Sequence, residues 1–240
     1  MKIIYETKHL IVFLCLFFIC NIYAQENQET IYIQHDSIAG LNYLDVYNGT
    51  VHFNKDITLK GEHRYLYTNF KSTTVNYDGE KYFHIQTKYD LVNDVLTILP
   101  YKSTSNVSIN AITDKVASFY INELNRNFVN LDVLAVEGSA HGFYEKLTEN
   151  KELELYTKFI KKPRDIIKNN RSLITYNLSE TYYVVYKNTL HEVESASSFI
   201  DLFPSKKDLI KNFFKENKKL RKNNLPDFLS RLTKQLDQSL

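Results

Sequence analysis

Residues 73–85 read TTVNYDGEKYFHI, and this stretch decides the predicted fold. Asp78-Gly79 is a strong signal for a two-residue hairpin turn of type I′, in which both central residues take positive φ. The turn sets three cross-strand pairs: Tyr77 with Glu80, Val75 with Tyr82, and Thr73 with His84. An aromatic residue opposite a β-branched one, as in the second pair, stabilises one face of a hairpin. The stretch therefore predicts two antiparallel strands joined at residues 78 and 79.

Short strand signals continue on both sides of this hairpin. Asn48-Gly49 is a second hairpin turn signal, and Pro100 ends a predicted strand. The other predicted strands cover residues 81–89, 95–99, 116–121, 127–134, 142–147, 153–160, 172–176, 182–186 and 190–193. Turn residues separate them without intervening helical periodicity, which is typical of antiparallel sheets. The sequence predicts a mainly β domain over residues 25–204: an antiparallel meander forming a roll, a sandwich or a half-open barrel.

The periodicity changes after Pro204. Ser205 and Asp208 are spaced as in a capping box, and apolar residues then recur at helical spacing up to Leu220. Pro226 stands at the start of a second helix with its own apolar stripe. Residues 205–240 carry a net charge of +6, whereas residues 25–204 carry a net charge of −5. The sequence thus predicts a basic amphipathic tail of two C-terminal α-helices, residues 205–240, packed on the β domain.

Five lysines of this tail fall on the face opposite its apolar residues. They are Lys207, Lys211, Lys215, Lys218 and Lys222, and they lie within about 80° of one another at about 100° per residue. Such a basic face can contact an anionic membrane surface. The alternative is structural: the helix packs on the acidic β domain and its lysines are solvated. Both interpretations stay open, and these lysines are the candidate surface-contact residues.

The first 24 residues have the pattern of a secretory signal peptide. After a basic start, residues 10–20 form an unbroken apolar run, and Ala24 is a small residue suited to the cleavage site. A transmembrane anchor needs roughly 20 apolar residues, and this run has 11. A lipid anchor at Cys20 is disfavoured because three bulky residues, 17–19, precede the cysteine. Export to the periplasm or the peripheral envelope, with cleavage after Ala24, is the predicted localisation.

Export removes both cysteines from the predicted mature chain. Cys15 and Cys20 lie within the signal segment, so residues 25–240 hold no disulfide, no thiol nucleophile and no cysteine metal ligand. The histidines of the mature chain show none of the spacings at which two histidines of one element bind a metal. We therefore predict no metal and no cofactor.

The stretch around His141 holds the candidate catalytic groups. His141 and Glu145 are four residues apart, which leaves a hydrolase site as a hypothesis, on condition that another acid or histidine joins them in a cleft. The adjacent Gly138-Ser139-Ala140-His141-Gly142 is not a nucleophile elbow, because the serine follows the first glycine directly. With no catalytic motif present, a non-enzymatic role is the leading expectation.

Several short turn-and-strand motifs are similar to those of a known family. The motifs are Asn48-Gly49-Thr50, Gly61-x-x-Arg64-Tyr65, Tyr77-Asp78-Gly79-x-x-Tyr82, Tyr89-Asp90-Leu91 and Gly142-Phe143-Tyr144-Glu145. In these motifs the mature chain resembles a family of functionally uncharacterised exported proteins of Bacteroidetes. The resemblance implies export, and it assigns no activity, cofactor or site residue.

Three functions fit the sequence. The leading hypothesis is an exported, non-enzymatic periplasmic binding or assembly protein of the cell envelope. The first alternative is a carrier of lipid or another hydrophobic molecule in a half-open β-barrel, which requires an apolar interior on the order of several hundred Å3. The second alternative is the hydrolase near His141 and Glu145. Nucleic acid is not an expected partner of an exported chain, so an anionic membrane surface or a hydrophobic ligand are the partner classes that remain.

Overall fold

The computed structural model describes residues 30–34, 44–101 and 107–240. The predicted signal peptide, its cleavage site after Ala24 and both cysteines therefore lie outside the described residues. Within the part of the chain that is described, no helix is both long enough and apolar enough to cross a membrane.

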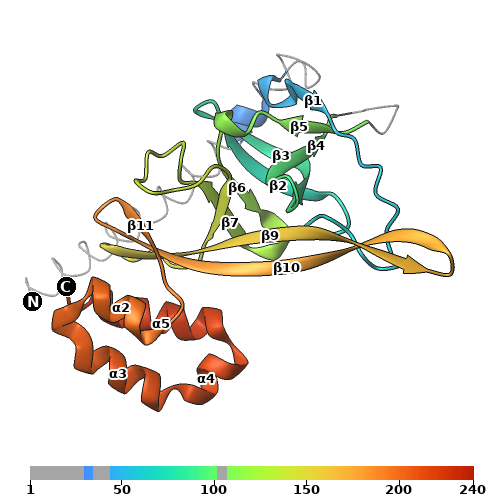
Figure 1. Ribbon diagram of the computed structural model, residues 1–240. Coiled ribbons are helices and arrows are strands. Elements are labelled where there is room, and N and C mark those ends of the chain that lie inside the picture. Colours follow the sequence, from blue (N-terminus) through green and yellow to red (C-terminus); the bar gives the residue numbers. More distant parts are fainter. Residues whose placement is uncertain (1–29, 35–43, 102–106) are drawn as a thin grey trace, which may run out of the picture.

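A single antiparallel sheet of 11 strands dominates the structure (Figure 1). Its strands are β1 (Gly49–Val51), β2 (Lys71–Tyr77), β3 (Glu80–Asp90), β4 (Val95–Leu99), β5 (Ile109–Ala111), β6 (Val116–Ile121), β7 (Arg126–Asn130), β8 (Phe143–Lys146), β9 (Leu153–Lys168), β10 (Arg171–Tyr186) and β11 (Thr189–Glu192). Their order is β1-β5-β4-β3-β2-β6-β7-β8-β9-β10-β11, so the sheet has two edges and is not closed. The predicted mainly β, antiparallel fold with C-terminal helices is confirmed.

The hairpin at residues 73–85 forms with one change of register. Asp78 and Gly79 have φ of 54° and 85°, as the predicted turn requires. Tyr77 pairs with Glu80 and Val75 with Tyr82, but Thr73 pairs with Ile85. The third predicted pair is wrong because His84, with φ of 57°, forms a β-bulge that adds one residue to β3.

The second predicted hairpin turn, Asn48-Gly49, is wrong. Asn48 ends a 3-10 helix, η1 (Asp45–Tyr47), and Gly49 begins β1, which pairs with the distant strand β5. A side chain at Gly49 would place its Cβ 2.2 Å from the backbone oxygen of Asn110. Glycine is therefore needed here for the close approach of two strands, rather than for a turn.

The longest hairpin joins β9 and β10, which pair over all 16 residues of each strand. Asn169 and Asn170, with φ of 52° and 56°, form its two-residue turn. The half next to β8 and β11 belongs to the sheet, and the other half extends beyond the body of the molecule (Figure 1). The predicted strands 153–160, 172–176 and 182–186 are thus parts of one continuous pair.

The main hydrophobic core covers the inner face of strands β2 to β8. Four of its rings contact one another: Tyr89 meets Phe119, Phe128 and Phe143 edge to face, and Phe119 stacks on Phe128 with centroids 4.9 Å apart. All four are almost completely buried. Aromatic pairs of this geometry add to the free energy of burial. The sheet therefore encloses a side-chain-filled core, not an open interior.

Four C-terminal helices pack on the base of the β9–β10 hairpin: α2 (Ala196–Leu202), α3 (Lys207–Glu216), α4 (Lys218–Asn223) and α5 (Leu225–Asp237). In Figure 1 they lie below β9 and β10, on the side away from β1 to β5. Leu155 and Val184 of the hairpin belong to the same buried cluster as Phe228 and Leu232 of α5. The apolar stripe of α5, predicted from its periodicity, is the surface that joins the helices to the sheet.

The helical part differs from the predicted pair of helices in two places. Its first helix, α2, begins at Ala196, where Ser195 and Ser198 form a capping box, and a 3-10 turn (Pro204–Lys206) includes Ser205. The predicted capping box at Ser205 is wrong because no side chain caps α3. The long first helix is also interrupted at Asn217, whose side chain donates a hydrogen bond to the carbonyl of Phe213 (3.0 Å) and so competes with helix continuation.

Candidate functional site

The two residues of the hydrolase hypothesis have different partners. Glu145 on β8 is buried and accepts two hydrogen bonds from the guanidinium of Arg126, of 2.5 and 2.7 Å. The exposed imidazole of His141 has its Nδ1 3.4 Å from Asp114 and 3.8 Å from Asp132. The structure therefore does not join His141 and Glu145 in one site.

The Arg126–Glu145 pair lies within the sheet face rather than in a cleft. The guanidinium carbon of Arg126 is 5.1 Å from the ring centroid of Phe128 and 4.9 Å from that of Phe159. A planar guanidinium suits both contacts at once, because its edge pairs with the carboxylate while its face stacks on the rings. This arrangement neutralises Glu145 and fixes its position.

The loop before β8 is ordered by a buried lysine and a carboxylate. Lys158 on β9 donates to Asp94 (2.7 Å) and to the carbonyl of His141 (3.1 Å). Asp94 also accepts hydrogen bonds from the Tyr89 hydroxyl (2.6 Å) and the Phe143 backbone N–H (3.2 Å). Burial, together with the negative charge of Asp94, raises the pKa of Tyr89 well above its usual value, so the ring stays a neutral donor. Residues 138–142 thus have a structural role in this loop, which is to position β8.

Buried hydroxyl groups occupy the end of the main core. Thr73 and Thr87 share a hydrogen bond of 2.7 Å, and the Tyr67 hydroxyl lies 3.3 Å from Thr87. Burial raises the pKa of Tyr67 to about 12. These groups satisfy one another inside the protein, as buried polar groups must. They leave the concave face filled at this end too.

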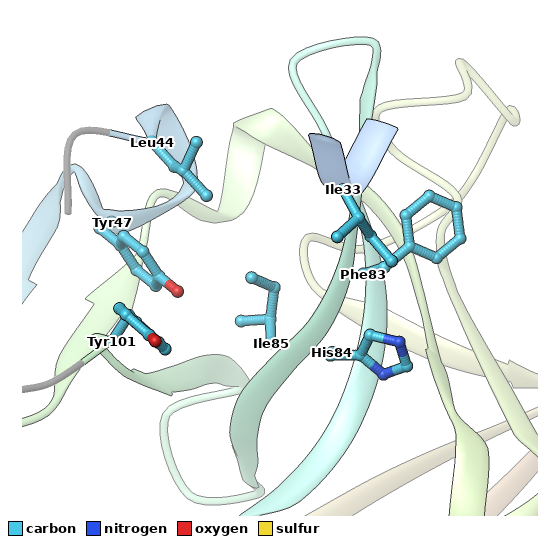
Figure 2. Close-up of a pocket in the computed structure, with 7 residues that line it drawn as sticks. All are labelled: Ile33, Leu44, Tyr47, Phe83, His84, Ile85 and Tyr101. Atoms are coloured by element: carbon cyan, nitrogen blue, oxygen red, sulfur yellow. The ribbon is translucent and has the colours of Figure 1, made fainter. Parts of the chain in front are cut away.

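A pocket of about 180 Å3 lies beside the β3 bulge (Figure 2). Figure 2 shows Leu44, Tyr47 and Tyr101 on one side of the space, Ile33, Phe83 and His84 on the other, and Ile85 between the two groups. A lipid carrier needs on the order of several hundred Å3 of apolar space. This pocket is smaller, and the sheet face beneath it is filled by the aromatic core. This pocket therefore does not supply the interior that the carrier hypothesis requires.

Among the described residues, no three His, Cys, Asp or Glu side chains come together as ligands for a metal ion. Asp114 and Asp132 each approach His141 at the surface without forming such a group. Comparison of the chain with models of known protein families, with curated proteins and with solved structures finds no match.

The five candidate lysines all lie on the solvent side of the C-terminal helices. Lys207, Lys211 and Lys215 follow one another along α3, while Lys218 and Lys222 lie on α4, after the break at Asn217. All five are exposed, and none forms an ion pair with another described residue. The opposite face of α3 is buried through Ile210 and Phe214. The structure thus keeps the lysines outward, on two short helices in place of one.

A second cationic surface was missed at the sequence level. It lies on the part of the β9–β10 hairpin beyond the sheet and consists of Lys162, Arg164, Lys168 and Arg171. The sequence does contain two indications of this surface. The first three cations are separated by even numbers of residues, which places them on one face of a strand, and Asn169-Asn170 marks a turn. Arg171 joins the other three cations only because β10 pairs antiparallel with β9. The sequence alone does not reveal this pairing.

Proposed function

We propose that this chain is an exported, non-enzymatic binding or assembly protein of the bacterial envelope, held at an anionic surface by cations on its C-terminal helices. The observation that carries the proposal is the outward face of α3 and α4, where five exposed lysines have no counter-ion among the described residues. Basic side chains near an anionic membrane surface each add about 1 kcal/mol to binding. The buried face of the same helices fixes them to the sheet, so the lysines are presented by a rigid body.

The interior supports a role at the surface. The buried carboxylates Asp90 and Glu145 contact Arg64 and Arg126, and the half-buried Asp94 contacts Lys158. A carboxylate held in this way serves the structure and is not poised for acid–base chemistry. The concave face of the sheet is filled by rings. The charged side chains that can contact a partner therefore lie on the surface of the protein.

The predicted signal peptide supports the envelope as the place of action, and the periplasm is the compartment that we propose. Sequencing of the N-terminus tests this part. The chain is expressed in full in a bacterial host with an outer membrane and recovered from the periplasmic fraction. We expect a mature start at Gln25. A start at Met1, or recovery in the cytoplasm alone, would contradict export.

Binding to vesicles tests the surface contact. The full chain is expressed, and the protein is purified in the form that the cell produces after any processing. It is then sedimented with vesicles of phosphatidylglycerol and phosphatidylcholine in equal parts, at about 0.1 M salt. We expect binding to these vesicles and not to phosphatidylcholine alone. Replacement of all five lysines by glutamine is expected to weaken binding at least about tenfold. Equal binding to both kinds of vesicle would refute an electrostatic contact.

A further inference from the structure

The β9–β10 hairpin is held by contacts along its middle, and its outer end projects beyond them (Figure 1). On one strand Lys161 donates to the carbonyls of His63 (2.7 Å) and Tyr65 (2.8 Å). On the other strand the Tyr176 hydroxyl donates to Asp56 (2.5 Å). Burial is the largest cause that raises the pKa of Tyr176, and the hydrogen bond to Asp56 is the second. The hydroxyl therefore stays protonated, and remains a donor, at any physiological pH. The outer part of the hairpin therefore projects from a rigid base.

A short segment of the chain supports the same base. Residues 57–59 run beside β10, where Leu59 donates to the carbonyl of Ile174 (3.0 Å) and Ile174 donates to the carbonyl of Ile57 (2.9 Å). Figure 1 shows this segment descending to meet the hairpin. We name residues 162–177 the distal ribbon. Its attachment on both strands means that little conformational freedom is lost when its outer part contacts a partner.

One face of the distal ribbon carries only cations as charged groups. The strand register places Lys168 opposite Arg171, Arg164 opposite Thr175, and Lys162 opposite Asn177. Because side chains alternate between the two faces, all four cations share one face, and Asp165 lies on the other. All four are exposed, and none has an ion-pair partner among the residues that the structure describes.

The pairing of Lys168 with Arg171 is unfavourable in the isolated molecule. Like charges directly opposite one another across two strands destabilise a hairpin. Here the pair closes the hairpin next to its turn, with no acid on the same face. An anionic partner would remove this repulsion on binding. The charge pattern thus favours a negatively charged occupant.

Aliphatic side chains accompany these cations at the outer end. Ile166 and Leu173 form a half-buried cross-strand pair on the cationic face. Ile167, on the other face and two residues before the turn, is 84% exposed, and Ile57, next to Ile174, is 70% exposed. If the ribbon contacts a flat surface with its tip, side chains from both faces of its outer end reach that surface. Exposed aliphatics near cations match the boundary between lipid headgroups and acyl chains. Phosphate recognition in nucleic acids needs the cations and makes no use of an isoleucine at the tip.

We propose that the distal ribbon docks by its tip on an anionic lipid surface, with Lys162, Arg164, Lys168 and Arg171 contacting lipid phosphates and Ile167 entering the acyl boundary. The inference rests on the proposed function for the class of partner, but it places the contact on a surface separate from the lysines of α3 and α4. It predicts two independent parts of the binding energy, one that depends on salt and one that depends on Ile167.

Two variants with the same change in charge separate the two surfaces. In the first, Lys162, Arg164, Lys168 and Arg171 are replaced by glutamine; in the matched control, Lys207, Lys211, Lys215 and Lys218 are replaced by glutamine. The vesicle assay described above is used, and urea unfolding confirms that both variants fold. We expect the ribbon variant to lose at least about tenfold in affinity for phosphatidylglycerol vesicles, since each contacting cation is worth about fivefold.

The absence of tryptophan from the chain permits a direct probe of insertion. Ile167→Trp places a single tryptophan at the tip, and Leu134→Trp places one at an exposed loop position as the control. On addition of phosphatidylglycerol vesicles we expect a blue shift of emission, and quenching by brominated acyl chains, for Ile167→Trp alone. Identical spectra for the two variants would overturn insertion of the tip.

The outcomes also separate this inference from the proposed function. If the helix control loses binding and the ribbon variant binds like the unaltered protein, the proposed function stands and the ribbon inference fails. If the unaltered protein binds no anionic vesicle, both fail. If a DNA duplex binds in a ribbon-dependent manner and vesicles do not, the ribbon recognises a different polyanion and the lipid inference is overturned.

Discussion

Gly142 shows how one residue determines the placement of β8. Its φ of 101° is unfavourable for any side chain, and a Cβ at this position would lie 1.9 Å from Asp94 Oδ2. Glycine thus lets the chain pass the carboxylate that receives Lys158, Tyr89 and the Phe143 backbone. The short stretch before Phe143 is explained by this close approach, without a catalytic role.

Substitution of Gly142 by alanine is expected to destabilise the protein strongly. Gly61→Ala is the control, because Gly61 also has a positive φ (90°), but nothing beyond its chain neighbours lies within 4 Å of the place that a Cβ would take. We expect about 1–2 kcal/mol for the control, from backbone strain alone. Gly142→Ala should cost at least about 1 kcal/mol more, because the Asp94 contacts must also move. Equal losses in urea unfolding would contradict the role of the close approach.

At the scale of elements, the start of the helical part depends on Ser195. Its hydroxyl accepts the Ser198 backbone N–H, and the Ser198 hydroxyl in turn accepts the N–H of Ser195. Ser205, which has the same three-residue spacing to the acidic Asp208, lies in a 3-10 turn instead. The helix starts where Val193 and Phe199 are buried, and this packing overrides the local signal at Ser205.

Two serine variants test that assignment. Ser195→Ala is expected to lower the free energy of unfolding by about 1 kcal/mol, since the Ser198 backbone N–H at the start of α2 loses its side-chain acceptor. Ser205→Ala is expected to change it by less than about 0.5 kcal/mol, as for other exposed positions. Chemical unfolding followed by circular dichroism compares the two. A larger loss at Ser205 than at Ser195 would show that the cap is assigned to the wrong serine.

The strands that could be predicted from sequence are those in which alternating burial and turn residues agree. The strands at residues 95–99 and 116–121 have the predicted bounds, because each carries buried aliphatics and ends at a turn or proline. Residues 161–168 escaped prediction because both of their faces meet mostly solvent there, so no apolar alternation marks them. Their strand form comes from pairing with β10, a long-range property that local pattern does not contain.

Long-range pairing also limits how much of the candidate sites can be predicted from the sequence. The lysine stripe at residues 207–222 follows from helical periodicity alone, and the lysines are indeed outward. Its division at Asn217 does not follow, because it depends on one side chain bonding the Phe213 carbonyl. The cation face of the distal ribbon requires the register of two strands. The separation of His141 from Glu145 requires knowing that Arg126, 19 residues before Glu145, pairs with it.

At the scale of the whole molecule, β9 and β10 connect two cores. Toward the strands β2 to β8, Phe159 joins the main aromatic core, and toward the helices Leu153 and Leu155 join the second core. Between them lie the buried Thr157 and the Arg126–Glu145 pair. The hairpin is thus both the shared wall of two cores and the base of the distal ribbon. Motion of the helices relative to the sheet would disturb the ribbon's support.

Asp237 fastens the end of α5 to the start of β9. Its carboxylate accepts the backbone N–H groups of Lys151 (3.3 Å), Glu152 (2.8 Å) and Leu153 (2.9 Å). A negative charge at a helix C-terminus is unfavourable toward the helix dipole. The three donors must therefore outweigh that cost. Burial alone would raise the pKa of Asp237, but these backbone hydrogen bonds lower it below its usual value.

The lowered pKa of Asp237 predicts how the clamp depends on pH. A carboxyl group whose pKa is lower in the folded state stabilises the protein above its unfolded pKa, about 3.9, and loses this contribution as the pH falls through the folded value. We expect Asp237→Asn to lower the free energy of unfolding by about 1 kcal/mol at pH 7. The difference from the unaltered protein should persist at pH 5 and narrow progressively below about pH 4.

Urea unfolding of Asp237→Asn at a series of pH values measures this dependence, with Asp201→Asn as the control. The side chain of Asp201 is exposed on α2 and forms no hydrogen bond or ion pair with other described residues, so its variant carries the same charge change without the clamp. We expect the control to follow the unaltered protein at every pH. A loss at Asp237 that stays constant down to pH 3 would show that the side chain acts by packing. The charge-assisted link between helices and sheet would then have to be abandoned.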